Sequence, residues 1–238
     1  MTITAAMVLA AGLGTRMRPL TDDRPKALVE VGGRALIDHM LDRLVAAGVT
    51  RAIVNVHAFA DRLEAHLMHR RDVEIVISDE RARLMETGGG VRQARPLLGD
   101  APIFVANIDS IWLNDEGALA RLAAGFDPAR MGARLLLAPM ADVLGFDGAG
   151  DFHMGGDGAL ARRGAAPAAD WAYTGVQVID PRIVDGEPLE PFSFTRVWRA
   201  LEGEGRLFGA GLQGLWMHVG DPGARAAAEA RCAHTAPA

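Results

Sequence analysis

Short apolar runs alternate with amphipathic segments over the first 125 residues, and this alternation limits the folds that the chain can adopt. The strand-like runs are short and almost continuously apolar, and they cover residues 3–10, 51–57, 73–78 and 102–108. The segments with apolar side chains at helical spacing are residues 36–45, 59–68 and 90–98. Strand–helix–strand repeats of this kind form right-handed crossovers. The order therefore predicts an α/β fold of the Rossmann-like, doubly wound type, with a mostly parallel (mixed) sheet and helices on both faces.

The second half of the chain is less regular. Its predicted strands are residues 133–139, 171–180, 206–210 and 215–219. A glycine- and aspartate-rich stretch at 145–158 indicates hairpins or a flexible flap. Ser193 is expected to cap a helix that ends at Leu201, and Asp221 to cap a last helix beginning at Pro222. Because no Pro/Gly/Ser-rich linker divides the chain, we expect residues 1–238 to form a single domain.

Composition and charge exclude several classes of protein. Half of the residues are apolar, which allows a sizeable core, and the formal net charge of −5 argues against nucleic acid as the main partner. No run of about 18 apolar residues is present to span a membrane, and the N-terminus does not resemble a signal peptide. Cys232 is the single cysteine and cannot form an internal disulfide. We therefore expect a cytoplasmic protein.

A glycine-rich segment, LAAGLGTRMRPLT, follows the first strand and precedes a Pro-Lys pair. Gly12 and Gly14 lack Cβ atoms, so their backbone N–H groups can approach a phosphate closely. Arg16, Arg18 and Lys26 place three cations within eleven residues of an acidic chain. This clustering predicts a polyphosphate ligand. The alternative is a tight strand-to-helix turn with surface arginines.

Two better-known glycine motifs do not match this segment. A Walker A loop requires G-x-x-x-x-G-K-[ST], which is absent. A dinucleotide fingerprint requires a third glycine where this chain has Met17. A nicotinamide oxidoreductase is therefore excluded on the pattern of the loop.

The same segment resembles the signature of the sugar-1-phosphate nucleotidylyltransferases (nucleoside-diphosphate-sugar pyrophosphorylases), L-A-A-G-x-G-T-R-[LM]-x-P-L-T followed by P-K. The resemblance implies the nucleotide-diphospho-sugar transferase type of fold. Residues 1–125 would then be the nucleotide-binding half, and residues 126–238 would hold the sugar-binding insert and the metal side. It also implies that Arg16 and Lys26 are catalytic. The nucleotide-binding residues that it assigns to this loop are Leu9, Ala10, Ala11, Gly12, Gly14 and Thr15.

A second glycine motif, METGGG, occupies residues 85–90. A run of three glycines lets a flat ring lie against the backbone, whereas the alternative is a plain loop with Thr87 capping the next helix. The motif resembles the [LM]-E-T-G-G-G element of a bacterial branch that includes N-acetylmuramate-1-phosphate uridylyltransferases. In that branch the base is recognised at this loop. The resemblance thus assigns the base to Gly88 and Gly89, with Glu80 as a further nucleotide-binding candidate.

Asn107 and Asp109 follow the fourth strand of the first half. An aspartate at the carboxyl end of a parallel strand faces the crevice where ligands bind, and its oxygens suit Mg²⁺. The alternative is a cap or turn aspartate. The family pattern here is N-[GS]-D, which implies a catalytic and metal-binding Asp109 and a nucleotide contact at Asn107. Ile108 departs from that pattern.

A late segment, LWMHVGD, resembles the W-x-D-[IV]-G-T element of the family, whose aspartate is the second metal ligand. His218 stands at that position and Asp221 replaces the threonine. Because histidine suits hard Mg²⁺ poorly, three alternatives stay open. Asp221 replaces the usual ligand, or the metal is held by Asp109 and the phosphates, or the ion is Mn²⁺.

The segment YTGV resembles the [FY]-[ST]-G-[IV] element that lines the sugar pocket in the family. This resemblance assigns Tyr173, Thr174 and Gly175 to the sugar. From the residues alone, an ordinary strand with a bulge glycine is an equal alternative.

The motifs together imply that a nucleoside triphosphate and a sugar 1-phosphate give an NDP-sugar and pyrophosphate, in a monomer or homodimer without nucleic-acid or membrane partners. The leading pair is UTP with N-acetylmuramate 1-phosphate, a reaction of cell-wall recycling. GTP with a mannose- or heptose-type 1-phosphate is one alternative. The other is a homologue with impaired catalysis that binds nucleotides for regulation, which Ile108 and His218 favour.

Overall fold

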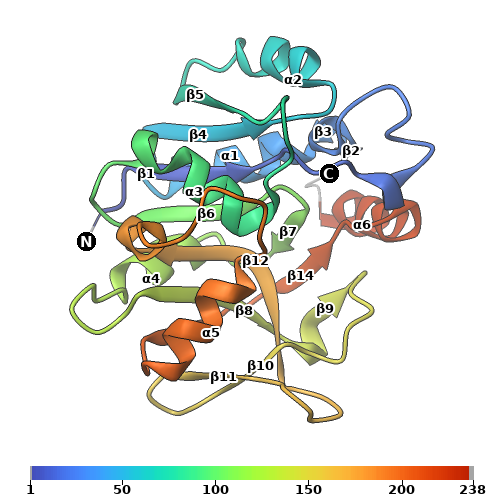
Figure 1. The fold of residues 1–238 in the computed structure, drawn as a ribbon. Helices are drawn as coiled ribbons and strands as arrows, with labels where there is room; N and C mark the ends of the chain where they lie inside the picture. The colour runs from blue at the N-terminus through green and yellow to red at the C-terminus, as the bar shows by residue number, and fades with distance from the viewer. Residues whose placement is uncertain (1, 236–238) are drawn as a thin grey trace.

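A computed structural model describes residues 2–235 of the protein. Figure 1 shows a central sheet with helices on both of its faces. The strands of this sheet are β1 (Ala5–Leu9), β4 (Arg51–Val56), β5 (Glu74–Asp79), β6 (Ile103–Asn107), β8 (Ala133–Pro139), β10 (Phe152–Met154), β11 (Leu160–Arg162), β12 (Trp171–Ile179) and β13 (Leu207–Gly211). Within the described residues their order is β11-β10-β12-β6-β1-β4-β5, and β8 pairs with both β12 and β13.

The sheet changes from parallel to antiparallel at β12. β1 pairs in parallel with β4 on one side and β6 on the other, and β4 pairs in parallel with β5. β12 runs antiparallel to both β6 and β8, while β13 is parallel to β8. The carboxyl ends of β1, β4, β5 and β6 therefore meet at one edge. The expected α/β fold with a mostly parallel, mixed sheet is confirmed.

The helices cover the two faces of the sheet over two separate cores. They are α1 (Leu36–Ala46), α2 (Ala60–Leu67), α3 (Glu86–Leu98), α4 (Ala118–Ala124), α5 (Thr195–Gly203) and α6 (Pro222–Thr235). Ala6 and Val8 of β1 face the core that α1, α2, α4 and α6 share, whereas Met7 faces the core of α3 and α5. Each fully buried Leu or Ile of these helices contributes about 1.5–3 kcal/mol to folding. No helix in residues 2–235 has the length and apolar character needed to cross a membrane.

Two small sheets complete the fold. β7 (Ser110–Leu113), β14 (Leu215–His218) and β9 (Val143–Leu144) form one, and β2 (Glu30–Val31) and β3 (Arg34–Ala35) form the other. The short 3₁₀ turns are η1 (Thr15–Met17), η2 (Lys26–Leu28), η3 (Met140–Asp142) and η4 (Pro181–Val184). In the β7–β14 ladder His218 lies opposite Ser110, so β14 ends beside the end of β6. The predicted hairpin near residues 145–158 is present as β10 and β11.

The predicted starts of α3 and α5 are wrong, whereas those of α1 and α6 are confirmed. The helix predicted over residues 90–98 begins four residues earlier, at Glu86, so the glycine run lies inside α3 and not in a loop. α5 begins at Thr195, after Phe194 as its N-cap, although Ser193 Oγ still accepts a hydrogen bond from Thr195 N at 3.3 Å. The capping of α6 is as predicted, because Asp221 Oδ1 accepts from Ala224 N at 2.9 Å.

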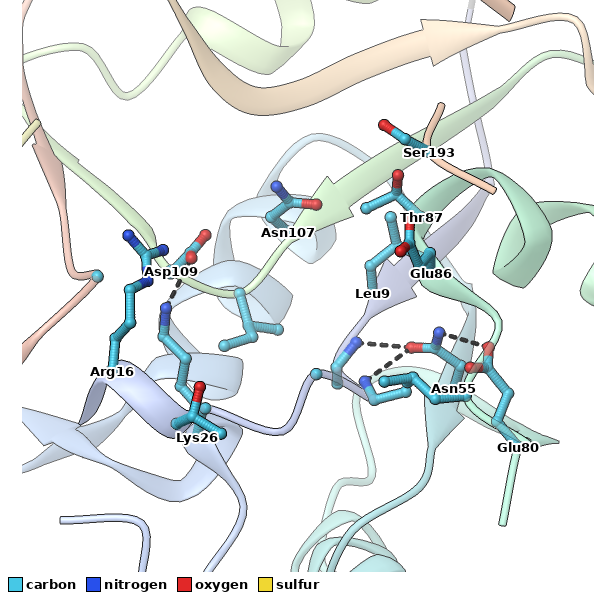
Figure 2. Close-up of a pocket in the computed structure, with 18 residues that line it drawn as sticks. Leu9, Arg16, Lys26, Asn55, Glu80, Glu86, Thr87, Asn107, Asp109 and Ser193 are labelled. Atoms are coloured by element: carbon cyan, nitrogen blue, oxygen red, sulfur yellow. Dashed lines mark hydrogen bonds and ion pairs between the residues drawn. The ribbon is translucent and has the colours of Figure 1, made fainter. Parts of the chain in front are cut away.

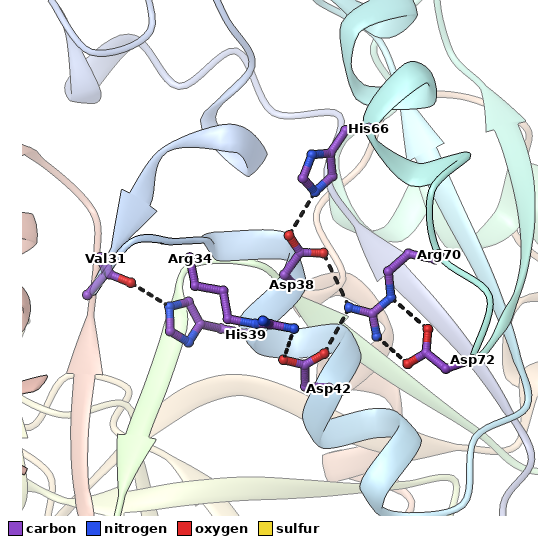
Figure 3. A network of polar contacts seen from close by, with 8 residues as sticks. All are labelled: Val31, Arg34, Asp38, His39, Asp42, His66, Arg70 and Asp72. Carbon is purple, nitrogen blue, oxygen red and sulfur yellow. Dashed lines mark hydrogen bonds and ion pairs between the residues drawn. The ribbon is translucent and has the colours of Figure 1, made fainter. Parts of the chain in front are cut away.

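A network of hydrogen bonds and ion pairs connects the turn after α2 to α1 (Figure 3). The guanidinium of Arg70 donates to Asp38 at 3.3 Å, to Asp42 at 2.8 Å and to Asp72 at 2.7 Å. His66 Nε2 lies 2.7 Å from the other oxygen of Asp38. The side chain of Arg70 is only 11% exposed. The network therefore holds α2 and the start of β5 in a fixed position on α1.

Candidate functional site

The edge where β1, β4 and β6 end opens into a cavity of about 430 Å³ (Figure 2). The lining residues that the sequence predicted as functional are Leu9, Ala10, Ala11, Gly12, Gly14, Thr15, Arg16, Lys26, Glu80, Asn107 and Asp109. The lining residues for which no ligand role was predicted are Asn55, Leu84, Glu86, Thr87, Ile108, Ser193 and Gly220. The fold thus gathers residues from six separate segments of the chain around one space.

The turn after β1 is built on a glycine that no other residue can replace without strain. Gly14 has a φ of 63°, and a Cβ added there would lie 2.9 Å from the Cβ of Lys26. Thr21 Oγ1 donates to Gly14 O at 2.9 Å and holds the turn closed. Figure 2 shows the outcome, with Arg16, Lys26 and Asp109 together on one side of the cavity.

Lys26 and Asp109 form an ion pair at this charged end. Lys26 Nζ lies 2.7 Å from Asp109 Oδ2, and the two side chains are 12% and 21% exposed. His218 Nε2 is 3.5 Å from the same oxygen. Burial disfavours the ionised form of Asp109, but the hydrogen bond from His218 and the charge of Lys26 outweigh it and hold the pKa of Asp109 well below its usual range. The carboxylate is therefore ionised throughout the physiological pH range.

The donors that a divalent cation would find here are few. Residues 2–235 contain no group of three or more His, Cys, Asp or Glu side chains placed to hold a metal. Asp221 lies at the start of α6, where its Oδ1 caps the helix, and His218 lies beside Asp109 with its Nδ1 3.2 Å from Gly145 O. One carboxylate with a neighbouring imidazole suits a cation that takes its remaining ligands from phosphate oxygens and water.

The residues predicted to bind sugar lie on β12, next to the cavity but not in its lining. Tyr173 N donates to Asp151 Oδ2 at 2.8 Å, and burial together with the charge of Asp109 raises the pKa of Tyr173. A Cβ added at Gly175 would lie 3.0 Å from the Cβ of Asn107, so this residue packs directly under the end of β6. Thr174 is buried and donates to a main-chain carbonyl of β8. Tyr173 and Gly175 thus adjoin the site, whereas the side chain of Thr174 is bound to the neighbouring strand β8.

Gly88 and Gly89 are not brought into the cavity. Their N–H groups donate to Phe192 O at 2.8 and 3.1 Å. A Cβ added at Gly88 would lie 2.3 Å from the Phe192 ring, and one at Gly89 would lie 2.4 Å from Glu190 O. The glycines let the segment 187–194, which we call the strap, cross closely over the first turn of α3. The predicted base-reading amides are therefore engaged with the strap.

Neighbours of these glycines line the cavity in their place. Glu86 and Thr87 contribute from α3 and Ser193 from the strap. Glu86 has a φ of 59°, a left-handed conformation that is uncommon outside glycine and is found often at functional sites. Thr87 Oγ1 accepts from Phe194 N at 2.9 Å, so the two lining segments are joined directly.

Asn55 is a lining residue that the sequence motifs missed. It lies in β4, RAIVNV, and it is a buried polar residue in a strand that is otherwise apolar after Arg51. That interruption was the available signal, because a polar side chain inside a buried strand must find partners. Its partners belong to the loop after β1 and to Glu80.

A mixed α/β sheet with a cavity outside the carboxyl ends of its parallel strands, where Arg16 and Lys26 lie, is typical of nucleotide-binding proteins of the doubly wound class. Residues 6–142 match the family described as the MobA-like NTP transferase domain, and the chain belongs to this family. It is 55% identical over 233 residues to the N-acetylmuramate alpha-1-phosphate uridylyltransferase of Caulobacter vibrioides, with 96% of each chain covered. It is 36% identical over 221 residues to the protein of that name from Neisseria meningitidis serogroup B, with 90% and 92% covered.

Solved structures share this fold at much lower sequence identity. The inositol-1-phosphate CTP transferase from T. maritima superposes with a TM-score of 0.80 at 18% identity, covering 100% of this chain and 99% of that one. The resemblance to sugar-1-phosphate nucleotidylyltransferases, drawn from the loop after β1, is confirmed by the relatives, and the protein is a nucleotidyltransferase.

Proposed function

We propose that this protein joins UTP and N-acetylmuramate 1-phosphate to give the UDP-sugar and pyrophosphate. The observation that carries this proposal is the 55% identity to a uridylyltransferase of that specificity over 96% of both chains. The cavity supports it, because the predicted phosphate-loop residues, Lys26 and Asp109 all line one space. We propose further that the protein acts in the cytoplasm, as a monomer or homodimer.

The reaction needs little covalent chemistry from the protein. An oxygen of the sugar 1-phosphate forms a bond to the α-phosphorus of UTP, and the bond from that phosphorus to the bridging oxygen breaks. Pyrophosphate leaves with the electron pair. Because the phosphate monoester is already an anion, no general base is required. Catalysis then depends on alignment of the two phosphates and on neutralisation of their charge.

The cations of the loop are suited to that neutralisation. Arg16 would bind the leaving pyrophosphate, since its planar guanidinium matches phosphate oxygens. Lys26 would neutralise the α-phosphate, and the cavity places its Nζ beside Asp109. Gly12, Gly14 and Thr15 would offer backbone N–H groups along the triphosphate. Tyr173 and Gly175, beside Asn107 and Asp109, would border the sugar.

Asp109 fits the role of ligand to Mg²⁺, because its carboxylate is ionised and lies at the charged end of the cavity. His218 would stand next to the ion, which makes Mn²⁺ a second candidate. When bound, the ion supplies positive charge to the phosphates of the nucleotide. Asp221 has a structural role as the cap of α6 and is not needed in this set.

The proposal is tested by measuring pyrophosphate release with UTP, GTP, CTP and dTTP, each combined with the 1-phosphates of N-acetylmuramate, N-acetylglucosamine and mannose. Mg²⁺ and Mn²⁺ are compared in parallel. We expect UTP with N-acetylmuramate 1-phosphate to give a kcat/KM at least about tenfold above every other pair. A preference for GTP and mannose 1-phosphate would replace the assigned substrates. Binding of UTP without release from any pair would show a nucleotide-binding homologue that has lost catalysis.

A further inference from the structure

Two buried polar side chains, Asn55 and Glu80, join the two loops that line the cavity (Figure 2). Asn55 Oδ1 accepts hydrogen bonds from the N–H groups of Ala10 at 2.6 Å and Ala11 at 3.1 Å. Asn55 Nδ2 donates to Glu80 Oε1 at 2.7 Å, and Glu80 Oε2 accepts from Met85 N at 3.0 Å. A continuous chain of hydrogen bonds therefore runs from the loop after β1 to the start of α3.

The carboxylate of Glu80 is bound within the protein, although the residue borders the cavity. Its side chain is on a residue that is 1% exposed, and both carboxylate oxygens already accept hydrogen bonds. Burial raises the pKa of Glu80, while the bonds from Met85 and Asn55 oppose that rise. Because both of its oxygens accept, the carboxylate dictates which way the amide of Asn55 faces. Asn55 must then present its oxygen to Ala10 and Ala11.

The pair is closed off from the other side by α3. A Cβ added at Gly90 would lie 2.9 Å from Glu80 Oε1 and 3.0 Å from Asn55 Nδ2. The third glycine of the METGGG motif therefore gives the pair its space. Such close packing leaves the two side chains a single arrangement, in which every polar end has a partner.

We propose that Asn55 and Glu80 are positioning residues, which hold the phosphate loop after β1 and the start of α3 at the separation that the nucleotide requires. Fixing Ala10 and Ala11 sets the direction of the backbone N–H groups that follow, at Gly12 and Gly14. Fixing Met85 sets the place of the next two lining residues. This assignment rests on the proposed function of the cavity and gives Glu80 an indirect role in place of the base contact expected from sequence.

The hydrogen-bond pattern allows a test by exchange of the two groups. In Glu80→Gln, the introduced amide group points a donor at another donor, either Asn55 Nδ2 or Met85 N. In Asn55→Asp, a second carboxylate faces the carboxylate of Glu80. In the double variant the introduced carboxylate accepts from Ala10 and Ala11, and the introduced amide donates to it and accepts from Met85. The double variant thus restores a complete pattern with the same net charge.

The first readout is the KM for each substrate in the pyrophosphate-release assay. We expect each single variant to raise the KM for UTP about tenfold or more, because a buried polar group loses its partner. The double variant should return the KM for UTP to within about threefold of the wild type, and the KM for sugar 1-phosphate should change by less than about threefold in all three variants. A double variant as impaired as the worse single variant would overturn the proposal.

Asp115→Asn is a matched control for simple loss of stability. Asp115 is also a buried acid, 5% exposed, and it accepts from Gln213 N at 2.9 Å and from Arg121. It does not line the cavity. We expect this variant to lower the melting temperature without raising the KM for UTP. If a single variant fails to fold, folding of the double variant is the expected rescue, and its absence counts against the proposal.

The second readout needs no substrate and stands even if the proposed reaction is wrong. Hydrogen–deuterium exchange of the ligand-free protein is followed in peptides that cover residues 6–14 and 84–90. We expect both segments to exchange faster in each single variant and at the wild-type rate in the double variant. Unchanged exchange in the single variants would overturn the positioning role. Absence of turnover in the wild type would overturn only the proposed function.

Discussion

Lys26 and Asp109 hold opposite charges at the end of the cavity where the phosphates are proposed to react. The side chain of Lys26 is 12% exposed, and its Nζ lies 2.7 Å from Asp109 Oδ2. We expect Lys26→Ala to lower kcat at least about 100-fold, because charge that develops on the phosphates loses a preorganised cation. The fold should persist, with a loss of about 1–2 kcal/mol, since Asp109 keeps His218 as a neighbour.

The measurements for Lys26→Ala are steady-state pyrophosphate release and far-UV circular dichroism. Arg24→Ala is the control in the same segment, because Arg24 pairs with Asp23 at the surface and does not line the cavity. We expect that control to keep the wild-type rate. Turnover of Lys26→Ala at the wild-type rate would remove Lys26 from the proposed chemistry.

Asp151 makes stability depend on pH in a defined direction. Its Oδ2 accepts from Tyr173 N, but burial outweighs this bond and the nearby charges of Arg163 and His218, so the pKa of Asp151 lies above 3.8. The folded state therefore binds the proton more tightly than the unfolded state. Raising the pH through this window ionises the buried group and lowers stability. We expect the free energy of unfolding of Asp151→Asn, relative to wild type, to increase between about pH 4 and pH 7.

Urea unfolding of both proteins across this pH range checks the prediction, and taking the difference cancels the other titrating groups. A difference that shrinks as the pH rises would show that Asp151 is stabilised, not strained, in its ionised form.

Individual site residues could be predicted where they lie in one continuous segment. The loop from Leu9 to Lys26 was predictable, because Gly12, Gly14, Arg16 and Lys26 are close together in sequence and also meet in the cavity. Arg18 does not line the cavity and pairs instead with Asp22 at the surface. The role of Asn55 could not be predicted, because its partner Ala10 is 45 residues away and a single asparagine in a strand does not indicate which residue it binds. The base was assigned to Gly88 and Gly89 because the sequence does not reveal that their N–H groups donate to Phe192 O.

The strap and α3 depend on the glycine run for their contact. A Cβ at Gly89 would lie 2.4 Å from Glu190 O, a main-chain atom that cannot turn aside. We expect Gly89→Ala to lower the free energy of unfolding by about 1–3 kcal/mol, since the strap must move away from α3. Gly186→Ala is the control just before the strap, because an added Cβ there meets no atom within 4 Å.

Chemical denaturation of the two glycine variants provides the comparison. Equal free energies of unfolding for Gly89→Ala and Gly186→Ala would show that the strap moves away from α3 without loss of stability. The close packing would then make no contribution to stability.

The network around Arg70 makes a separate prediction for α1 and α2. Its guanidinium satisfies three aspartates and is 11% exposed, so Arg70→Ala leaves Asp38 and its neighbours without their shared cation. We expect a loss of about 1–3 kcal/mol in the free energy of unfolding. Arg71→Ala is the matched control, because the hydrogen bonds of its guanidinium reach main-chain carbonyls and its side chain is exposed. A loss in Arg70→Ala no larger than in Arg71→Ala would assign the network no stabilising role.

Elements with a strong local pattern were predicted to within a few residues, whereas some short elements that depend on distant partners were missed. β1, β4 and β6 are buried runs that their own composition identifies. β7 was missed, because it exists as a strand through pairing with β14, about 100 residues later. α3 begins earlier than predicted even though glycine is a poor helix former, since contacts with the strap hold those glycines in place.

The two halves of the chain share one sheet, and β12 is the strand that joins them. It pairs with β6 of the first half and with β8 of the second, and the core under α3 also contains side chains of α5. We expect residues 1–238 to unfold in one cooperative step. Far-UV circular dichroism and the fluorescence of the four tryptophans should report the same urea midpoint, whereas two separate transitions would show two domains.

The alternation of strands and helices was sufficient to predict the fold class of the whole molecule. The strands β8, β12, β13 and β14 of the second half were predicted to within a residue, but their direction was not, because it depends on pairing with other strands, such as β6, in the assembled sheet. Strand direction is a property of the assembled sheet, which a short apolar run does not encode by itself.

The strap also has a thermodynamic consequence. It comes from the second half of the chain, yet it bonds to Thr87 and Gly88 in the first and places Ser193 in the cavity. A sugar phosphate that orders the second half would thereby change the affinity for the nucleotide. Linkage requires the effect to be mutual, so the nucleotide must change the affinity for the sugar phosphate by the same factor. The strap would therefore couple the binding of the two substrates.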